Sequence, residues 1–360
     1  MAGRLKRIRQ GIKRPLQTAF AGALVLPLDR RPRTVRDLDG YQARRIVVSR
    51  TDRIGDLLCC SPLLLALHRR WPEARLVLIA GAKNRATLQG LPFVEEGPVF
   101  RRNPRSWAQL AWWLSRQSFD LSVSLRAESM AGVWISAWSR APIRMATHRT
   151  YAHTSCNLIL GIDDFHQTTR YCRAAGVLGF PPEEIRPVFQ IPPEAARRAA
   201  ELLPGLAGPR AGPVVGFQIP HRGSKRHAVR AWPREKVVAL VRQLAVDGCR
   251  VVLCGIGEER AEAEFVRTQV PQTTVMPSVS LAVFAALQHH FDLFVSQYTG
   301  TLHLADAVGV PTVAYGLALQ VEGWRVIGPQ HRSIGAPRVA EIPVETLLAA
   351  TRSALAGRRV

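Results

Sequence analysis

Two successive series of short apolar runs, separated by helix-like segments, constrain the fold of this chain most strongly. The runs lie at 45–49, 75–80 and 121–125 in the first series, and at 214–218, 250–255, 291–296 and 311–315 in the second. Segments with helix-like patterns lie at 57–71, 106–117, 132–139, 170–178, 233–247, 258–269, 281–289 and 302–308. Runs that are apolar throughout are typical of parallel strands covered on both faces. The alternation predicts an α/β fold on parallel sheets, with 311–315 as the last core strand.

The length of the chain predicts more than one domain. Its 360 residues are too many for one ordinary α/β core and suit two domains of roughly 150 residues. Proline-rich segments at 181–193 and 204–213 mark the expected passage between them. We expect a basic extension at 1–40, an N-terminal domain at 41–195 and a C-terminal domain at 210–345. Each domain is predicted to be doubly wound, and the two to face a cleft, with ligands beyond the carboxyl ends of the strands.

The start of the chain is strongly basic. Residues 1–36 contain ten Lys and Arg and one acid, Asp29. The apolar run at 16–28 between the basic clusters is too short to span a bilayer. Each Lys or Arg near an anionic leaflet contributes about 1 kcal/mol to binding. The segment is therefore either a peripheral anchor on an anionic membrane surface or a disordered basic tail.

The whole chain is also basic, with a net charge of +22. Such a surface attracts phosphate-bearing substrates, anionic lipid or nucleic acid. No RNA-recognition, zinc or helix-turn-helix pattern is present, so we expect no nucleic-acid partner. The six cysteines form no C-x-x-C pair and have no zinc-ligand spacing. We expect them to be small buried side chains in a reducing compartment.

The segment 51–56 (TDRIGD) directly follows the first predicted strand. Gly55 permits a tight turn, and Asp56 stands where the next helix begins. A carboxylate at that place can take a proton from a sugar hydroxyl. It can equally be a helix cap that complements the helix dipole. Position alone does not separate these two roles.

Three further segments at predicted strand ends carry polar chemistry. The basic loop 221–227, which contains Lys225, and Arg230 after it either hold a diphosphate or form a solvated loop. At 299–301, Thr299, Gly300 and Thr301 begin a helix whose free N–H groups suit a phosphate, with His303 in its first turn. After Gly255, Glu258 and Glu259 either accept hydrogen bonds from ribose hydroxyls or complement a helix N-terminus.

Taken in order, these segments resemble glycosyltransferase family 9, the lipopolysaccharide heptosyltransferases. The resemblance rests on DRIGD at 52–56, SPLLLAL at 61–67, WPEAR at 71–75, HQTTRYCRAAGVLG at 166–179, RAWPRE at 230–235, GIGEE at 255–259, SLA at 280–282 and TGTLHLA at 299–305. It covers about residues 45–335. It implies a GT-B fold, with two Rossmann-like domains, and inverting transfer of a sugar, heptose from an ADP-heptose-like donor. No metal is expected, because cationic side chains and amides supply the charge and no carboxylate cluster suggests a divalent ion.

The resemblance also implies roles for single residues. Asp56 matches the catalytic base of the family. Arg230 stands where the family usually has a lysine on the donor diphosphate, and Lys225 is the alternative cation. Thr299, Gly300 and Thr301 match the phosphate loop of the family, and His303 matches a histidine that the family has at this position. Glu258 or Glu259 matches the residue that contacts the ribose.

Tyr298 departs from the pattern, because the family usually has an aspartate there that binds the donor sugar. A tyrosine cannot accept two hydroxyl hydrogen bonds as a carboxylate does. The expected function is transfer to a lipopolysaccharide or related surface-glycan acceptor, lipid-linked, at the cytoplasmic face of the plasma membrane. The alternative is a catalytically degenerate nucleotide-sugar-binding protein. Five tryptophans either line the acceptor site or belong to the core: Trp107, Trp112, Trp113, Trp134 and Trp138.

Overall fold

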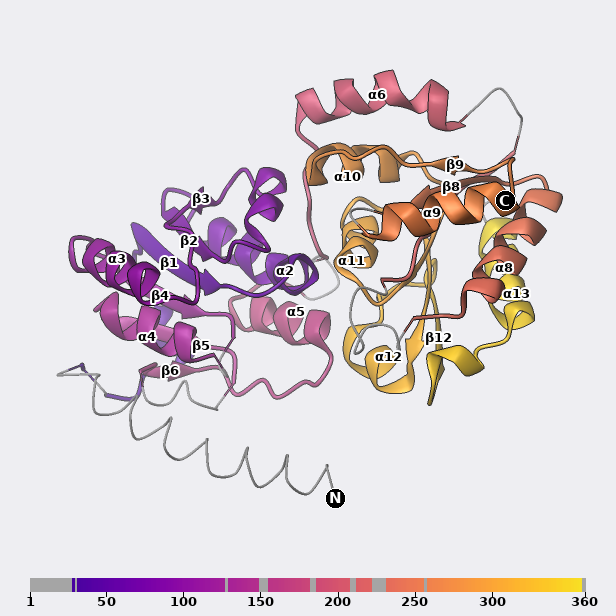
Figure 1. The fold of residues 1–360 in the computed structure, drawn as a ribbon. Helices are drawn as coiled ribbons and strands as arrows, with labels where there is room; N and C mark the ends of the chain where they lie inside the picture. Colours follow the sequence, from indigo (N-terminus) through magenta and orange to yellow (C-terminus); the bar gives the residue numbers. More distant parts are fainter. Residues whose placement is uncertain are drawn as a thin grey trace. The chain divides into compact units, whose positions relative to one another are not determined.

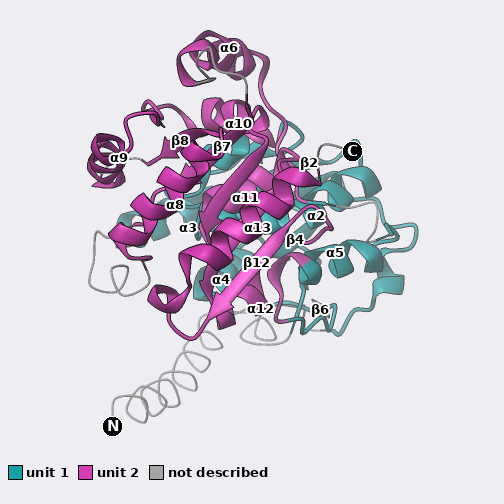
Figure 2. Ribbon diagram, turned by 90° about the vertical axis from the view of Figure 1, so that its right-hand side faces the viewer, with its two compact units in different colours: residues 1–88, 92–164, 169–186 teal, residues 89–91, 165–168, 187–360 magenta. Residues whose placement is uncertain are grey.

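The computed structural model describes residues 28–29, 31–126, 129–148, 155–181, 186–207, 212–221, 231–255 and 258–357. The chain divides into two compact units, teal and magenta in Figure 2. The first comprises residues 1–88, 92–164 and 169–186, and the second comprises 89–91, 165–168 and 187–360. Each unit contains one six-stranded sheet. Lys225, Arg230 and nearly all of the basic segment before residue 31 lie outside the described residues.

The first unit is a parallel sheet with helices between its strands (Figure 1). Its strands are β1 (Arg45–Arg50), β2 (Arg75–Ala80), β3 (Glu95–Glu96), β4 (Leu121–Ser124), β5 (Ile143–Ala146) and β6 (Leu158–Ile159). The helices in this part of the chain are η1 (Val35–Leu38), α2 (Ile54–Arg70), η2 (Arg85–Gly90), α3 (Pro104–Ser115), α4 (Met130–Trp138) and α5 (Gln167–Val177). The strand order is β3-β2-β1-β4-β5-β6, and all neighbours pair in parallel. The order reverses between β1 and β4, where doubly wound sheets bind ligands.

Both faces of the first sheet are covered. Val47 on β1 belongs to one apolar cluster with Leu110 of α3 and Ile135 of α4. Because side chains alternate along a strand, Ile46 and Val48 point to the opposite face, and both are fully buried as well. This double burial explains why the strand is apolar throughout, as its sequence predicts.

The second unit repeats the arrangement. Its strands are β7 (Val214–Gln218), β8 (Arg250–Cys254), β9 (Thr274–Val275), β10 (Leu293–Gln297), β11 (Thr312–Leu317) and β12 (Arg332–Ala336). Its helices are α6 (Pro193–Ala207), α8 (Arg234–Val246), α9 (Glu258–Gln269), α10 (Leu281–His289), α11 (Gly300–Ala307), α12 (Ala318–Trp324), η5 (Val339–Glu341) and α13 (Val344–Ala356). The order β12-β11-β10-β7-β8-β9 is parallel throughout. Counted from the start of each unit, both sheets have the Rossmann order, and this one reverses between β7 and β10.

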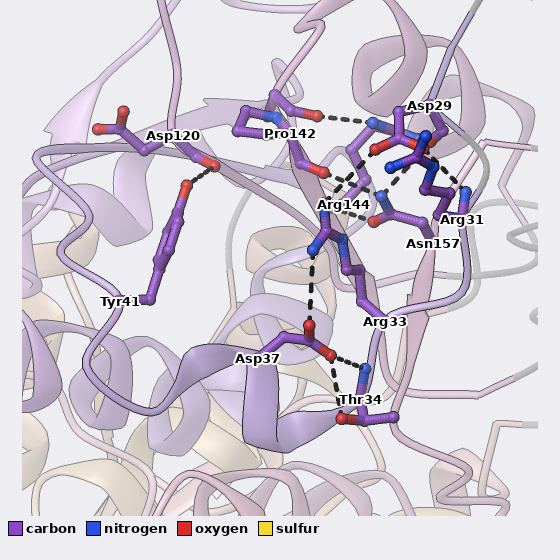
Figure 3. Close-up of polar contacts among 11 residues, drawn as sticks. Asp29, Arg31, Arg33, Thr34, Asp37, Tyr41, Asp120, Pro142, Arg144 and Asn157 are labelled. Carbon is purple, nitrogen blue, oxygen red and sulfur yellow. Dashed lines mark hydrogen bonds and ion pairs between the residues drawn. The ribbon is translucent and has the colours of Figure 1, made fainter.

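Residues 31–41, called the strap below, fasten the start of the described chain to the edge strand β6 (Figure 3). The N–H of Arg33 donates to the carbonyl of Asn157 (2.7 Å), and Arg33 forms a parallel bridge with Leu158. Leu38 of η1 is buried, and its carbonyl accepts from Arg70 Nη2 (2.9 Å). The strap therefore belongs to the first unit.

The buried Arg144 of β5 stabilises the same sheet edge through hydrogen bonds to backbone carbonyls. Its guanidinium donates to the carbonyls of Ser155 (2.5 Å), Ala141 (2.7 Å) and Asp29. The Asn157 side chain accepts from the Arg144 N–H (2.8 Å) and donates to the Pro142 carbonyl (2.9 Å). Figure 3 shows these side chains converging on one end of the strap.

The α/β prediction is confirmed, but some elements were not predicted. The run 311–315 corresponds to β11, the last buried strand, and β12 adds a half-exposed edge strand beside it. The proline-rich passage between the predicted domains contains a full helix, α6, that packs against α10. No helix within the described ranges is both long and apolar enough to cross a bilayer.

Candidate functional site

Asp56 lies in the first turn of α2, just beyond the carboxyl end of β1. The Arg53 N–H donates to Asp56 Oδ2 (3.1 Å), so this oxygen caps the helix N-terminus. The other oxygen, Oδ1, lies 3.3 Å from Arg50 Nη2. The side chain is 15% exposed. One carboxylate thus has the capping geometry and, at its second oxygen, a charged partner.

Arg50, the last residue of β1, is the charged centre of this cluster. Its Nη1 donates to the carbonyl of Leu125 (2.9 Å) and to the hydroxyl of Tyr171 (2.8 Å). Its Nη2 contacts Asp52 Oδ2 (3.4 Å) as well as Asp56. The Arg50 side chain is only 4% exposed. A guanidinium that is buried to this degree requires such partners, because an unpaired buried charge is very unfavourable.

The cluster sets the ionisation of Asp56 through opposing effects. Burial raises the pKa of Asp56 above its usual value, the Arg50 charge lowers it, and the negative charge of Asp52 raises it. Asp52 also pairs with Arg126 Nη1 (2.9 Å), which follows β4. Arg50 and Arg126 thus lie at the ends of β1 and β4, the two strands between which the sheet order reverses. The raised pKa makes Asp56 a stronger base than an exposed aspartate.

The sequence did not single out Arg50, Asp52, Arg126 or Tyr171. The sequence feature that could have indicated Arg50 is its place as a charged residue at the end of an apolar strand, directly before the segment 51–56. An arginine there also fits a solvated loop. Tyr171 comes from α5, more than a hundred residues along the chain, and no local pattern connects it to β1.

The predicted phosphate loop forms a chain of hydroxyl groups in the second unit. Ser296 Oγ lies 3.2 Å from Thr299 Oγ1, which lies 2.8 Å from Thr301 Oγ1. The Thr301 hydroxyl donates to Gln218 Oε1 (3.0 Å). Thr299 is the N-cap of α11, and Gly300 is its first residue. The loop therefore lies across the ends of β7 and β10, where the second sheet reverses its order.

Glu259 is brought to the first residue of the predicted basic loop. Its Oε1 lies 2.7 Å from His221 Nδ1, and its side chain is largely buried. Gly255 ends the strand here, and a side chain in its place would meet the backbone and Cβ of Glu259 at 2.8–2.9 Å. Glu258 is exposed at the start of α9. Of the two candidate ribose contacts, Glu259 is therefore the one that the described residues hold in place, through His221.

His303 is packed inside the second unit. It is 3% exposed, and the ring of Trp324 lies 6.0 Å from its own. Burial, and to a smaller extent the nearby His166, lowers its pKa to about 4. The imidazole is therefore neutral at neutral pH. This geometry is that of a histidine packed in the interior of the unit.

Tyr298 is largely buried beside the same helix. Its ring packs against an apolar cluster of Leu302, Ala314 and Val326. A side chain at Gly316 would meet the ring at 2.8 Å. Burial raises the pKa of the phenol above its usual value. The aromatic side chain that replaces the expected aspartate is thus part of the packing of this unit.

The tryptophans of the first unit divide into two groups. The rings of Trp107, Trp134 and Trp138 pack on one another with centroids 4.9–5.7 Å apart, and Trp113 packs on Phe119. Trp112 is 59% exposed. The packed tryptophans therefore belong to the core of the first unit, and the exposed Trp112 does not.

Across the described ranges, no group of three or more His, Cys, Asp or Glu side chains could hold a metal ion; metal-free transfer stays a prediction. The six cysteines are free thiols, and four of them are buried: Cys59, Cys60, Cys156 and Cys254.

A family model described as glycosyltransferase family 9 (heptosyltransferase) matches residues 107–341. The chain belongs to this family. It is a glycosyltransferase of the heptosyltransferase type. No curated protein sequence matches it.

Solved structures match almost the whole of this family 9 glycosyltransferase. A family 9 glycosyltransferase from Veillonella parvula has a TM-score of 0.72 at 19% identity, with 87% of this chain and 98% of that one covered. The Escherichia coli ADP-heptose lipopolysaccharide heptosyltransferase II has a TM-score of 0.72 at 19% identity, with 88% and 100% covered. The E. coli heptosyltransferase WaaC with ADP-2-deoxy-2-fluoro heptose has 0.65 at 17%, with 86% and 99% covered. With both sheet orders, these matches confirm the predicted GT-B fold of two Rossmann-like domains.

Proposed function

We propose that this family 9 glycosyltransferase transfers a heptose from an ADP-linked donor to a hydroxyl of a lipopolysaccharide or related surface glycan. Asp56 takes the proton of the acceptor hydroxyl while the oxygen of that hydroxyl forms a bond to the anomeric carbon of the heptose. The bond from that carbon to the diphosphate breaks, and the nucleotide diphosphate leaves with inversion. The observation that carries this proposal is the Asp56 carboxylate, which is partly exposed, has a raised pKa and lies at the reversal of the first sheet.

The donor is assigned to the second unit in this proposal. The hydroxyl chain of Thr299 and Thr301 and the start of α11 bind the diphosphate, and Glu259 accepts from the ribose. Lys225 and Arg230 neutralise the leaving group, which requires no metal. Relatives solved with ADP and with ADP-2-deoxy-2-fluoro heptose support the choice of an ADP-linked donor.

The acceptor end of the proposal is a lipid-linked glycan at the cytoplasmic face of the plasma membrane. The net charge of +22 and the ten basic residues before residue 37 support contact with an anionic membrane surface. A peripheral enzyme would meet such an acceptor without crossing the bilayer.

The test of this function is Asp56→Asn. The amide retains an oxygen that can accept the Arg53 N–H, but it cannot accept a proton from the acceptor. We expect kcat to fall by about 10²–10⁴-fold with ADP-heptose and a lipopolysaccharide acceptor. The affinity for ADP-heptose should stay close to that of the wild type. The melting temperature should fall, because the buried Arg50 keeps only Asp52 as a carboxylate partner.

A matched control is Asp37→Asn. Asp37 has the same capping role in η1, where its Oδ2 accepts the Thr34 N–H (2.6 Å), but it belongs to the strap and not to the end of β1. This variant should retain wild-type transfer. Full activity of Asp56→Asn would remove Asp56 as the base.

Tyr298 favours a second candidate, a nucleotide-sugar-binding protein that has lost catalysis. Its ring fills apolar space where a donor-binding aspartate is usual in the family. Under this hypothesis the wild-type chain binds ADP-heptose but gives no product with any glycan acceptor. Turnover by the wild type would exclude it.

A further inference from the structure

The outer side of α3 has an unusual surface, called the α3 face below. Arg105, Gln109, Trp112 and Arg116 follow one another at helical spacing, so they lie along one side of the helix. All four are exposed. The opposite side of the helix, with Leu110 and Leu114, is buried in the core of the first unit. The exposed row ends at Arg116, the C-cap of the helix.

The charge of this face is entirely positive. From Gly97 to Phe119 the chain contains four arginines, Arg101, Arg102, Arg105 and Arg116, and no acid. Among the described residues, no carboxylate forms an ion pair with any of the four. In contrast, Arg75 pairs with Glu95 at 2.7 Å on the neighbouring edge strand. The α3 arginines are therefore available to an external anion.

The loop before the helix is held in a defined shape. The Asn103 side chain accepts the N–H of Ser106 (2.8 Å), and the Ser106 hydroxyl accepts the N–H of Arg101 (2.9 Å). These two hydrogen bonds fix the turn that carries Arg101 and Arg102 next to the first turn of α3. The four arginines thus belong to one continuous surface.

Trp112 lies within this basic row. Its side chain is 59% exposed, and the guanidinium of Arg116 lies 4.0 Å from the ring centroid. An exposed indole among cations is typical of side chains at the headgroup level of a membrane, where its apolar body and N–H face different surroundings.

We propose that the α3 face, together with Arg101 and Arg102, docks on an anionic lipid surface. The arginines bind lipid phosphates, and Trp112 inserts between headgroups. This contact uses other residues than the N-terminal basic segment, and it brings the first unit itself to the membrane. It adds a specific surface to the proposed meeting with a lipid-linked acceptor, but it does not depend on the transfer chemistry.

The test is sedimentation of the full-length protein with vesicles, without nucleotide sugar. One set of vesicles is phosphatidylcholine alone, and the other contains equal parts of phosphatidylcholine and phosphatidylglycerol. The wild type should bind only the second set. Each arginine lost weakens binding about fivefold, so Arg105→Glu/Arg116→Glu should weaken it at least about 25-fold. Trp112→Ser should weaken binding to anionic vesicles without a change in charge.

The matched control is Arg197→Glu/Arg260→Glu, which changes the net charge equally at two exposed positions on α6 and α9. It should bind anionic vesicles almost as the wild type does, and all variants should have similar melting temperatures. Equal weakening by both double variants would overturn the proposal, because net charge alone would then explain binding. Unchanged vesicle binding by the α3 variants, with loss of binding to a duplex oligonucleotide instead, would assign the face to nucleic acid.

Discussion

At the scale of single residues, Arg50 is the side chain on which the ionisation of the candidate base depends. Arg50→Met removes the charge that lowers the pKa of Asp56, so that pKa should rise. The acidic limb of the kcat/KM–pH profile should then move to higher pH. Arg50→Lys keeps a charge and should leave the limb near its wild-type position, although it loses hydrogen bonds to Leu125 and Tyr171.

The pH profile separates this role from a purely structural one. Arg50→Met should also cost about 3–5 kcal/mol of stability, because two carboxylates lose a buried partner. Tyr171→Phe serves as the control, since it removes one hydroxyl and leaves the Arg50–Asp56 pair. If the acidic limb of Arg50→Met coincides with that of Tyr171→Phe, Arg50 does not set the pKa of Asp56.

His303 gives a second prediction at this scale. Its folded-state pKa of about 4 lies below the 6.5 of a free histidine, so the unfolded chain binds more protons between these values. Stability is therefore lost as the pH falls from about 6.5 towards about 4, and this one group accounts for about 2 kcal/mol at pH 4.5. His303→Gln should lose less stability than the wild type between pH 7 and 4.5. Urea unfolding at both pH values measures this, and equal losses would contradict the assigned cause.

Single residues also show where sequence reasoning reaches its limit. Asp56 and the 299–301 loop were predictable because each directly follows an apolar strand, and strand ends are where such sheets bind ligands. The partners of Asp56 were not, because Arg50 and Tyr171 meet only through the packing of β1 and α5. Likewise, a histidine at the start of a helix is compatible with a binding or a buried role, and only its burial beside Trp324 in the folded unit distinguishes them.

At the scale of secondary-structure elements, the strap tests whether residues before β1 are part of the fold. Leu38→Ala removes the side chain that anchors η1, which is 1% exposed. We expect a loss of about 2–5 kcal/mol in the free energy of unfolding. The exposed neighbour Arg36→Ala should change stability by no more than about 0.5 kcal/mol. Denaturant unfolding compares the two, and equal stability would mean that the strap contributes nothing to the first unit.

Elements were predictable where burial on two faces left a clear apolar run, as at β1, β2 and β8. Four of the missed strands, β3, β6, β9 and β12, are at sheet edges and are short or half-exposed. The fifth, β5, lies inside the first sheet and is buried, but it is short and Arg144 interrupts its apolar run. β3 consists of two exposed glutamates, and β12 is only partly buried. Helix α6 was hidden by its prolines, since Pro193 is its first residue, where proline is favoured, and Pro204 lies within it. Its Ala195 and Ala199 are nevertheless buried, which is consistent with tertiary packing outweighing proline in holding the helix.

At the scale of the whole molecule, each of the two units has its own sheet and its own apolar core. A unit of this size can unfold as a cooperative whole. The donor groups proposed above, Glu259, Thr299 and Thr301, all belong to the second unit. A ligand that binds one folded unit should therefore stabilise that unit and leave the other unchanged.

Scanning calorimetry should accordingly show two transitions, and ADP-heptose at about 100 times its Kd should raise only one of them, by about 2.7 kcal/mol of added stability. Two variants assign the transitions. Leu38→Ala should lower the transition of the first unit, and Leu253→Ala, whose side chain is fully buried on β8, should lower that of the second. ADP-heptose should then raise the transition that Leu253→Ala lowers. If ADP-heptose instead raises the transition that Leu38→Ala lowers, its binding groups lie in the first unit. If only a sugar linked to UDP or GDP raises the transition that Leu253→Ala lowers, the site stays in the second unit but the donor is a different nucleotide sugar.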